Sequence, residues 1–366
     1  MAKKQSQQNK SNKEYPKIGK TILNDIRGKN IPRTLLQEFK DIYQFYINHE
    51  KRKKLSEMGR VRRWLKVGWW ILKSMFFKLT PVRRILFLLG IVLTFSFNNN
   101  DTDNKFLIGV AVIIIVLMLE LKDNLLAHDE LMVGRAVQMS LMPEENPIIP
   151  GWDIWIYSRP ANEVGGDLVD YMNVGENKWG FALGDVAGKG LGAALLMAKL
   201  QATLRAIAPN FKSLSKLGAE LNNIFCRDGI PTRFISLAFL KLTAESGSVK
   251  VLNAGHMPPF LISENKITEM SHANVALGIK AKVSYKEQRV DLKKGELLFV
   301  YSDGVTEARS GKNKFFGETR LMNLLLKNSN LASIDIGKKV LSSVKQFVRD
   351  ERPSDDLSMI LLKRKD

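Results

Sequence analysis

The chain has 366 residues, a length that suggests about two domains. Its 45% hydrophobic and 25% charged residues are ordinary for a globular protein and exclude a wholly disordered, collagen-like or disulfide-scaffold chain. The one cysteine, Cys226, cannot form a disulfide within the chain, which favours a reducing, cytosol-facing compartment.

The net charge of +19 is concentrated near the N-terminus. Residues 1–84 carry 22 Lys/Arg and 6 Asp/Glu, whereas the rest of the chain carries 34 and 31 and is nearly balanced. A basic segment of this kind can attract nucleic acid, but it can equally attract anionic membrane lipid, at about 1 kcal/mol per basic residue near the surface. We expect anionic lipid as the partner of this segment and no nucleic acid.

Residues 1–80 are expected to form a basic, largely helical region that is cytosolic or lies at a membrane interface. Residues 1–13 are polar and lysine-rich, typical of a disordered tail, and no apolar core of a secretory signal follows them. Apolar residues at three- and four-residue spacing predict a helix over 33–58. Tryptophans and lysines over 64–79 suit a helix in a membrane interface, or one packed on its own domain.

Two uncharged apolar runs follow, at 85–97 and 106–119, separated by the polar sequence NNNDTDNK. Each is shorter than the about 20 residues of a typical span, but flanking residues and the snorkelling side chains of Arg83 and Arg84 extend them. We expect a transmembrane hairpin over 81–121; the alternative is a buried helical hairpin of a soluble domain. The positive-inside rule then predicts a cell-membrane protein whose N-terminus and C-terminal domain are both cytoplasmic.

A linker helix is predicted over 122–143, ending at Pro143. The pattern of residues 120–142 carries an incomplete apolar stripe, which suits either a parallel homodimer stalk or packing on the next domain. Both alternatives remain open from the periodicity alone.

The segment 144–366 mixes helix and strand patterns and is expected to form one α+β domain. Because the strands cluster in hairpin-like groups instead of alternating with helices, a layered α+β domain is favoured over a doubly wound parallel sheet. The predicted strands are 153–158, 178–184, 234–242, 248–253, 285–290, 296–302 and 357–363, and the predicted helices are 190–207, 212–226, 318–327 and 333–349.

Acidic residues recur where apolar runs end or glycine-rich turns begin. They are Asp167 in EVGGD, Asp185 in GDVAGKG, Asp303 in SDG, and the pair Asp355 and Asp356 before LSMILL. Carboxylates that converge at strand ends repel one another unless cations bridge them, and oxygen ligands suit Mg²⁺ or Mn²⁺. Each motif alone is an ordinary turn sequence; their joint occurrence in this order is what indicates a site.

The segment from Met139 to the C-terminus resembles the bacterial PPM-type serine/threonine phosphatases of the stage II sporulation protein E kind, a branch related to protein phosphatase 2C. The resemblance rests on the motifs QMSLMP, EVGGD, GDVAGKGLGAALLMA, NAGHMPP, SDGVTEA and DDLS. It implies a four-layer α/β/β/α sandwich, here preceded by the helical membrane-anchoring region, with two Mn²⁺ or Mg²⁺ ions at one edge.

The resemblance also assigns site residues. Asp185 should bridge the two ions with the carbonyl of Val186 near one of them, and Asp303 and Asp355 should complete the ligands, so Asp185 and Asp303 are the expected catalytic residues. Asp167 should bind a metal directly or through water, and Asp356 is a further ligand or a supporting residue. Lys189 and His256 are candidates for substrate binding, although a solvated lysine and a turn histidine are the plainer readings.

By resemblance, the expected function is hydrolysis of phosphoserine or phosphothreonine on a cytosolic regulatory protein, with anti-anti-sigma (STAS-type) proteins as leading candidates. Two divalent ions can lower the pKa of a shared water and direct it in line at phosphorus, so no protein nucleophile is needed. The alternative is a membrane-anchored scaffold that binds a phosphoprotein without catalysis.

Overall fold

The computed structural model describes residues 55, 58–95, 102–230, 232–263, 266–270, 274–311, 314–349, 351 and 353–365. The expected tail over 1–13 and nearly all of the expected helix over 33–58 therefore lie outside the described residues. The chain divides into two compact units, Met1–Asn124 and Leu125–Asp366.

The first unit is helical. It contains α4 (Arg60–Lys78), α5 (Pro81–Phe95) and the beginning of α6 (Thr102–Leu141). Helices α5 and α6 meet at two glycines: a Cβ on Gly109 would lie 2.8 Å from the carbonyl oxygen of Gly90, so no larger residue fits there. Arg83 on α5 joins Glu120 and Asp123 on α6 through ion pairs of 2.9 and 2.6 Å. The two helices are thus an antiparallel pair that is joined by ion pairs at one end.

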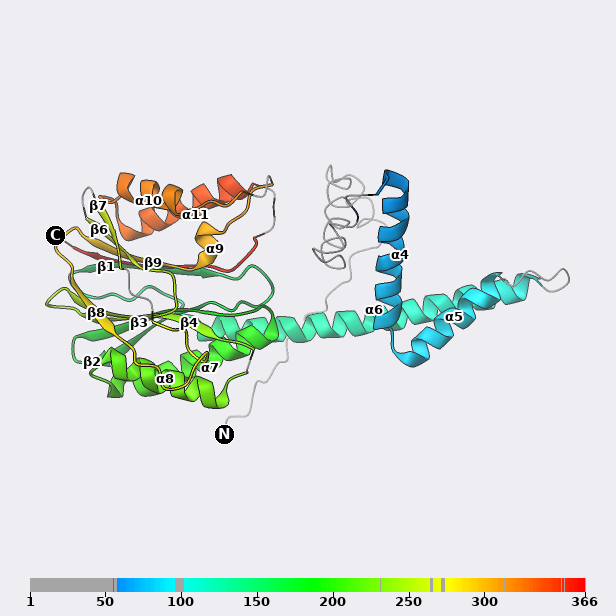
Figure 1. Ribbon diagram of the computed structural model, residues 1–366, viewed down its shortest axis with the longest axis horizontal. Helices are drawn as coiled ribbons and strands as arrows, with labels where there is room; N and C mark the ends of the chain where they lie inside the picture. Colours follow the sequence, from blue (N-terminus) through cyan, green and yellow to red (C-terminus); the bar gives the residue numbers. More distant parts are fainter. Residues whose placement is uncertain are drawn as a thin grey trace, which may run out of the picture. The chain divides into compact units, whose positions relative to one another are not determined.

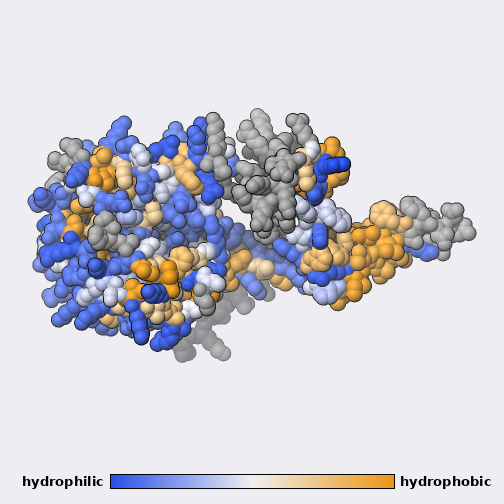
Figure 2. Space-filling view, in the orientation of Figure 1, coloured by the Kyte–Doolittle hydropathy of each residue, from blue (hydrophilic) through white to orange (hydrophobic). Residues whose placement is uncertain are grey.

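The apolar runs of the first unit are largely exposed, as the orange surface of α5 and α6 in Figure 2 shows. Among the described residues, two helices are long and apolar enough to cross a membrane: Asn104–Leu141 and Leu191–Asn210. The second is 44% buried and packs on a β-sheet, as a core helix does, whereas only 11% of the first is buried. Helix α5 has 15 residues, about 22 Å at 1.5 Å per residue, and is shorter than a full span.

The second unit is a four-layer sandwich (Figure 1). One sheet has the strand order β1 (Trp152–Arg159), β10 (Leu357–Arg364), β9 (Leu297–Tyr301), β6 (Phe260–Ser263), β7 (Lys266–Glu269). The other has the order β2 (Leu168–Gly175), β3 (Lys178–Val186), β4 (Ile235–Thr243), β5 (Ser248–Ala254), β8 (Glu287–Asp291). All neighbouring strands are antiparallel.

Helices cover the outer faces of both sheets. α7 (Leu191–Ile207) and α8 (Leu214–Asp228), linked by the short η1 (Ala208–Asn210), lie on the second sheet, and α10 (Glu318–Lys327) and α11 (Ser333–Val348) lie on the first (Figure 1). The four-residue α9 (Asp303–Thr306) follows β9. The predicted α+β sandwich of two antiparallel sheets with flanking helices is therefore confirmed.

Successive side chains of a strand point to opposite faces of its sheet, and in this way the strands contribute to three apolar layers: one between the sheets and one under the helices on each side. On β3, Phe181 and Leu183 point between the two sheets, whereas Ala182 and Val186 face α7 and α8. On β9, Leu298 and Val300 lie between the sheets, whereas Phe299 faces the helices of the other side. A strand covered on both faces reads as a continuous apolar run, which is why LLFVY is buried at every position.

The structure also contains three strands that the sequence pattern did not predict: β2, β6 and β7. Strand β2 has the sequence LVDYMNVG, in which the fully buried Asp170 breaks the apolar pattern. Its carboxylate is paired with Arg205 of α7 at 2.8 Å, a partner 35 residues away that a local pattern cannot reveal. Strands β6 and β7 are only four residues long, and β7 is mostly exposed.

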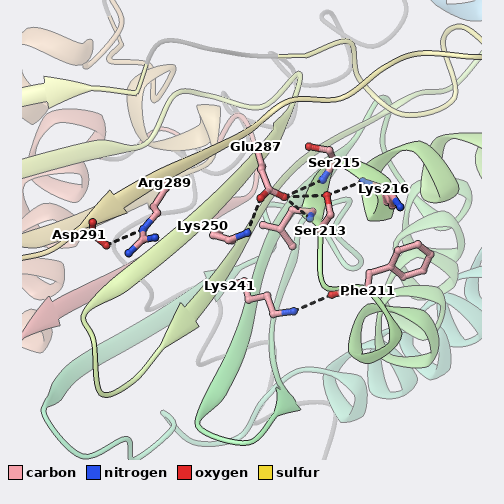
Figure 3. Close-up of polar contacts among 10 residues, drawn as sticks. Phe211, Ser213, Ser215, Lys216, Lys241, Lys250, Glu287, Arg289 and Asp291 are labelled. Atoms are coloured by element: carbon pink, nitrogen blue, oxygen red, sulfur yellow. Dashed lines mark hydrogen bonds and ion pairs between the residues drawn. The ribbon is translucent and has the colours of Figure 1, made fainter.

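Glu287 on β8 fixes the start of α8 (Figure 3). Its Oε2 accepts hydrogen bonds from the backbone N–H groups of Leu214 and Ser215 at 2.5 and 3.2 Å, and its Oε1 pairs with Lys250 at 2.7 Å. A carboxylate at this position satisfies free helix N–H groups and opposes the positive end of the helix dipole. Burial alone would raise the pKa of Glu287, but Lys250 and these N–H groups outweigh it and lower the pKa.

We predict that Glu287→Gln lowers the free energy of unfolding by about 1 kcal/mol at pH 7, the usual value for a lost helix cap. Because the folded state lowers the pKa of Glu287, its stabilisation is present above the unfolded pKa and is lost as the pH falls through the folded pKa. Urea unfolding at pH 7 and pH 4 should therefore show a difference that shrinks in acid. The exposed Glu176→Gln is the control; an equal loss there, or no loss in Glu287→Gln, would contradict the assignment.

Candidate active site

The acidic residues singled out from the sequence lie at matching strand ends. In one sheet, β2 and β3 pair Leu168 with Gly184, so Asp167 and Asp185 both lie at that end. In the other sheet, β9 and β10 pair Tyr301 with Met359, so Asp303 and the 355–356 pair both lie at one end. Hydrogen bonds from the Asp167 turn to Asp356 join the two ends. The five carboxylates thus share one edge of the sandwich.

Asp356 holds the glycine turn that precedes Asp167. Its carboxylate accepts hydrogen bonds from the backbone N–H groups of Ala161 at 2.7 Å, Gly166 at 2.6 Å and Asp167 at 3.2 Å. A Cβ on Gly165 would come within 2.5 Å of Oδ2 of Asp356, so the turn requires glycine there. Because backbone donors use both oxygens of this buried side chain, we infer for Asp356 the supporting role, one of the two roles that the sequence left open.

Gly166 brings the turn against the end of β3. A Cβ at this position would lie 3.2 Å from the carbonyl oxygen of Val186 and 3.6 Å from Oδ1 of Asp185. The glycine therefore leaves both oxygens clear on the side that faces the turn. These are the two oxygen atoms that the sequence analysis assigned to a bridging ligand and its neighbour.

Burial and mutual repulsion disfavour ionisation of these side chains. Burial, reinforced by the charges of Asp303, Asp355 and Asp356, raises the pKa of Asp185 to about 7. Burial and Asp355 raise the pKa of Asp303 to about 6. The pKa of the deeply buried Asp167 lies well above the ordinary carboxyl range, first because of burial and then because of Asp185. Perturbed carboxylates at one edge are typical of a functional site.

The donor set fits hard divalent cations. Oδ2 of Asp167 is buried and without a hydrogen-bond partner among the described residues, so one acceptor is left unsatisfied. All candidate ligands are carboxylate or carbonyl oxygens, the type that Mg²⁺ and Mn²⁺ prefer. Within the described part of the chain, no three acidic side chains converge on one point.

Lys189, a candidate for substrate binding from the sequence, lies at this edge beside Asp355. Its Nζ is 2.9 Å from Oδ2 of Asp355 and donates to the carbonyl of Ser354 at 2.5 Å. The side chain is about half exposed, so it remains accessible to a ligand. It is the cation that partly offsets the repulsion at Asp185 and Asp303.

His256 does not reach the surface. It is 5% exposed, its Nδ1 is 2.9 Å from the hydroxyl of Ser236, and its backbone is held by Asn253. Burial lowers the pKa of His256 to about 4, so the imidazole is neutral at pH 7. We therefore infer a structural role for His256 in the NAGH turn, and we do not propose the substrate contact considered from the sequence.

Gln138 was quoted only as part of a motif, and its role depends on the fold. Its amide exchanges two hydrogen bonds with the backbone of Gly165, one from Nε2 to the carbonyl at 2.7 Å and one from the N–H to Oε1 at 3.0 Å. The side chain is 4% exposed. The last turns of α6 therefore contact the turn that carries Asp167.

We predict that, without metal, Asp303→Asn stabilises the folded chain near pH 8. A carboxyl whose folded pKa is raised stabilises the fold only while protonated, so wild-type stability falls as the pH rises from about 4 to about 6. Thermal unfolding in EDTA should give similar midpoints for both proteins near pH 4.5 and a higher midpoint for the variant near pH 8. A pH-independent difference, or the same gain in the exposed control Asp129→Asn, would contradict this account.

The chain matches the family model of stage II sporulation protein E (SpoIIE) over residues 175–365. It is 27% identical over 310 residues to protein IcfG of Synechocystis, which covers 74% of this chain but only 48% of IcfG. It is 26% identical over 238 residues to the phosphoserine phosphatase RsbU of Bacillus subtilis, covering 64% of this chain and 70% of RsbU. The chain thus spans about half the length of the first of these relatives.

Among solved structures, the SiaA-PP2C domain of Pseudomonas aeruginosa superposes with a TM-score of 0.59 at 16% identity, covering 66% of this chain and 98% of that domain. At this identity the likeness establishes the fold alone, and that fold is the two-sheet sandwich described above. The family model covers more than half of the chain and includes β3, β9 and β10, whose ends carry the acidic edge. The chain therefore belongs to the stage II sporulation protein E (SpoIIE) family, and its second unit has the fold of a PP2C domain.

Proposed function

We propose that this chain is a Mn²⁺- or Mg²⁺-dependent phosphatase that hydrolyses phosphoserine or phosphothreonine on a cytosolic regulatory protein. The observation that carries the proposal is that Asp167, Asp185, Asp303 and Asp355 lie along one edge of the sandwich. The raised pKa values of Asp167, Asp185 and Asp303 indicate that these three carboxyl groups ionise together readily only when positive charge is bound beside them.

Each residue then has a distinct role. Asp185, Asp303 and Asp355, with Asp167 and the carbonyl of Val186, would hold two divalent ions. When bound, such ions supply a water of lowered pKa and neutralise charge on the phosphoryl oxygens. Asp356 keeps the Gly165–Asp167 turn in place through its three backbone hydrogen bonds. Lys189, exposed beside Asp355, is placed to attract an anionic substrate.

For the substrate we propose a phosphorylated anti-anti-sigma protein of the STAS type. Support comes from the family resemblance and from relatives named as phosphoserine phosphatases, RsbU and RsbP of Bacillus subtilis. Assignment by family is an analogy, since one fold serves several substrates.

The alternative is a scaffold that binds a phosphoprotein without hydrolysing it. We predict that the purified full-length chain hydrolyses a phosphoserine peptide with Mn²⁺ and not with EDTA. Asp303→Asn should lower turnover about 10²–10³-fold, the loss typical of removing one stabiliser of transition-state charge. The exposed Asp335→Asn is the matched control. Peptide binding without turnover under any divalent ion would favour the scaffold.

We further propose that the first unit attaches the chain to the cell membrane, with the N-terminus and the phosphatase domain in the cytoplasm. The exposed apolar surface of α5 and α6, the close glycine contact between them and the exposed Trp64 and Trp69 of α4 support this. Anionic lipid would bind the basic residues before α5. Release of the full-length protein from membranes by an alkaline carbonate wash would contradict insertion.

Helix α6 is proposed to relay a signal from the first unit to the active site. Support comes from its continuity over 40 residues and from Gln138, whose amide holds the carbonyl and N–H of Gly165 next to Asp167. Val133 and Val137 are exposed one turn apart on the same helix. A parallel homodimer through 120–142 would cover them, and it remains a prediction.

We predict that prolines at Leu125 and Leu131 change the activity or its regulation in the full-length protein, because proline breaks a helix interior. Gln138→Ala should lower turnover by loosening the turn that carries Asp167. The same substitution should lower turnover less in a chain that already carries the two prolines. Phosphatase assays of the single and combined variants test this coupling. Activity and regulation unchanged in the proline variants would refute the relay.

A further inference from the structure

Arg233 lies beside the loop that joins Asp185 to α7. The backbone N–H of Ala187 in that loop donates to the carbonyl of Phe234 at 2.9 Å, which ties the segment before β4 to the loop. The backbone of Arg233 itself is fixed by a hydrogen bond from its N–H to the carbonyl of Ile230 at 2.9 Å. The position of this arginine relative to the loop is therefore set by the fold on both sides.

The guanidinium rests on two glycines of GKGLG. A Cβ on Gly188 would lie 3.1 Å from Nη1 of Arg233, and a Cβ on Gly192 would lie 3.1 Å from Nη2. Both distances are tighter than ordinary van der Waals contact, so side chains at these positions would push the guanidinium away. Gly188 also has a φ of +106°, which glycine adopts without strain. The two glycines form a cradle for the guanidinium of Arg233.

Among the described residues, no anion pairs with this guanidinium. Its Nη1 is buried and has no hydrogen-bond partner among them, and no ion pair of Arg233 with them is present, while the residue as a whole is partly exposed. Its surroundings are positive: Gly188 and Gly192 flank the N-terminus of α7, whose first turn contains no acidic residue. An unpaired buried donor of a charged group is costly. The unpaired guanidinium of Arg233 therefore indicates that its anionic partner is a bound ligand.

We propose that Arg233 binds the phosphoryl group of the substrate through charge-assisted hydrogen bonds. This rests on the proposed function, and it adds a substrate-binding residue that no sequence motif singled out. Arginine matches a tetrahedral oxyanion in charge and geometry. The loop of Gly188 begins at Asp185, so the group bound by Arg233 lies on the same loop as the acidic edge. Bound phosphoserine and released inorganic phosphate share this chemistry.

The test uses the full-length Mn²⁺-loaded protein in detergent. Calorimetric titration with inorganic phosphate should show about tenfold weaker binding in Arg233→Met, as expected for losing a charge-assisted hydrogen bond. KM for a phosphoserine peptide should rise by a similar factor with kcat little changed. The matched control is Arg227→Met, which removes an exposed arginine paired with Asp228 and should leave both values unchanged.

A second variant separates binding from a purely structural role. Gly192→Ala introduces a Cβ against the guanidinium and should weaken phosphate binding in the wild-type background. It should have little further effect in Arg233→Met, because the displaced group is already absent. Arg233→Lys, which keeps the charge but loses the planar donor pair, should bind phosphate with intermediate affinity.

Wild-type phosphate affinity in Arg233→Met would overturn the proposal, as would an equal loss in Arg227→Met. Absence of turnover in the wild type, together with weakened phosphate binding in Arg233→Met, would instead refute the proposed catalytic function and leave the assignment of Arg233 intact.

Discussion

Electrostatic repulsion among carboxylates at one edge of the sandwich is the constraint on which the rest of the structure depends. Asp185 lies at a strand end of one sheet and Asp303 at a strand end of the other, and burial and like charge raise their pKa values to about 7 and about 6. Such an edge persists only because the surrounding fold is rigid. Two five-stranded sheets with apolar layers on both faces supply that rigidity.

The polar contacts around the edge divide into those that hold it and those that offset its charge. Asp356 holds the Asp167 turn from one side, and Gln138 holds it from α6. Lys189 offsets the charge at Asp355. Gln138 lies on α6, so the last turns of this helix contact the turn that carries Asp167 directly.

The sequence predicted the fold class, seven of the ten strands in the described part of the chain and the acidic residues near one edge, because apolar periodicity and short motifs are local signals. It did not predict β2, whose buried Asp170 is explained only by Arg205 on α7. It could not decide the role of Asp356, because that role depends on backbone donors nearly 200 residues away. Arg233 belongs to no motif, and only the packing against Gly188 and Gly192 indicates its importance.

We propose that this acidic edge binds two divalent cations, which replace protons on its carboxyl groups. Calorimetry of the metal-free, full-length chain with Mn²⁺, repeated in buffers of different ionisation enthalpy, measures ion stoichiometry and proton release together. We predict two ions per chain, with proton release that is smaller at pH 8 than at pH 6 because Asp185 and Asp303 ionise more fully without metal at the higher pH. Binding of no Mn²⁺, or binding unaffected by Asp185→Asn, would contradict it.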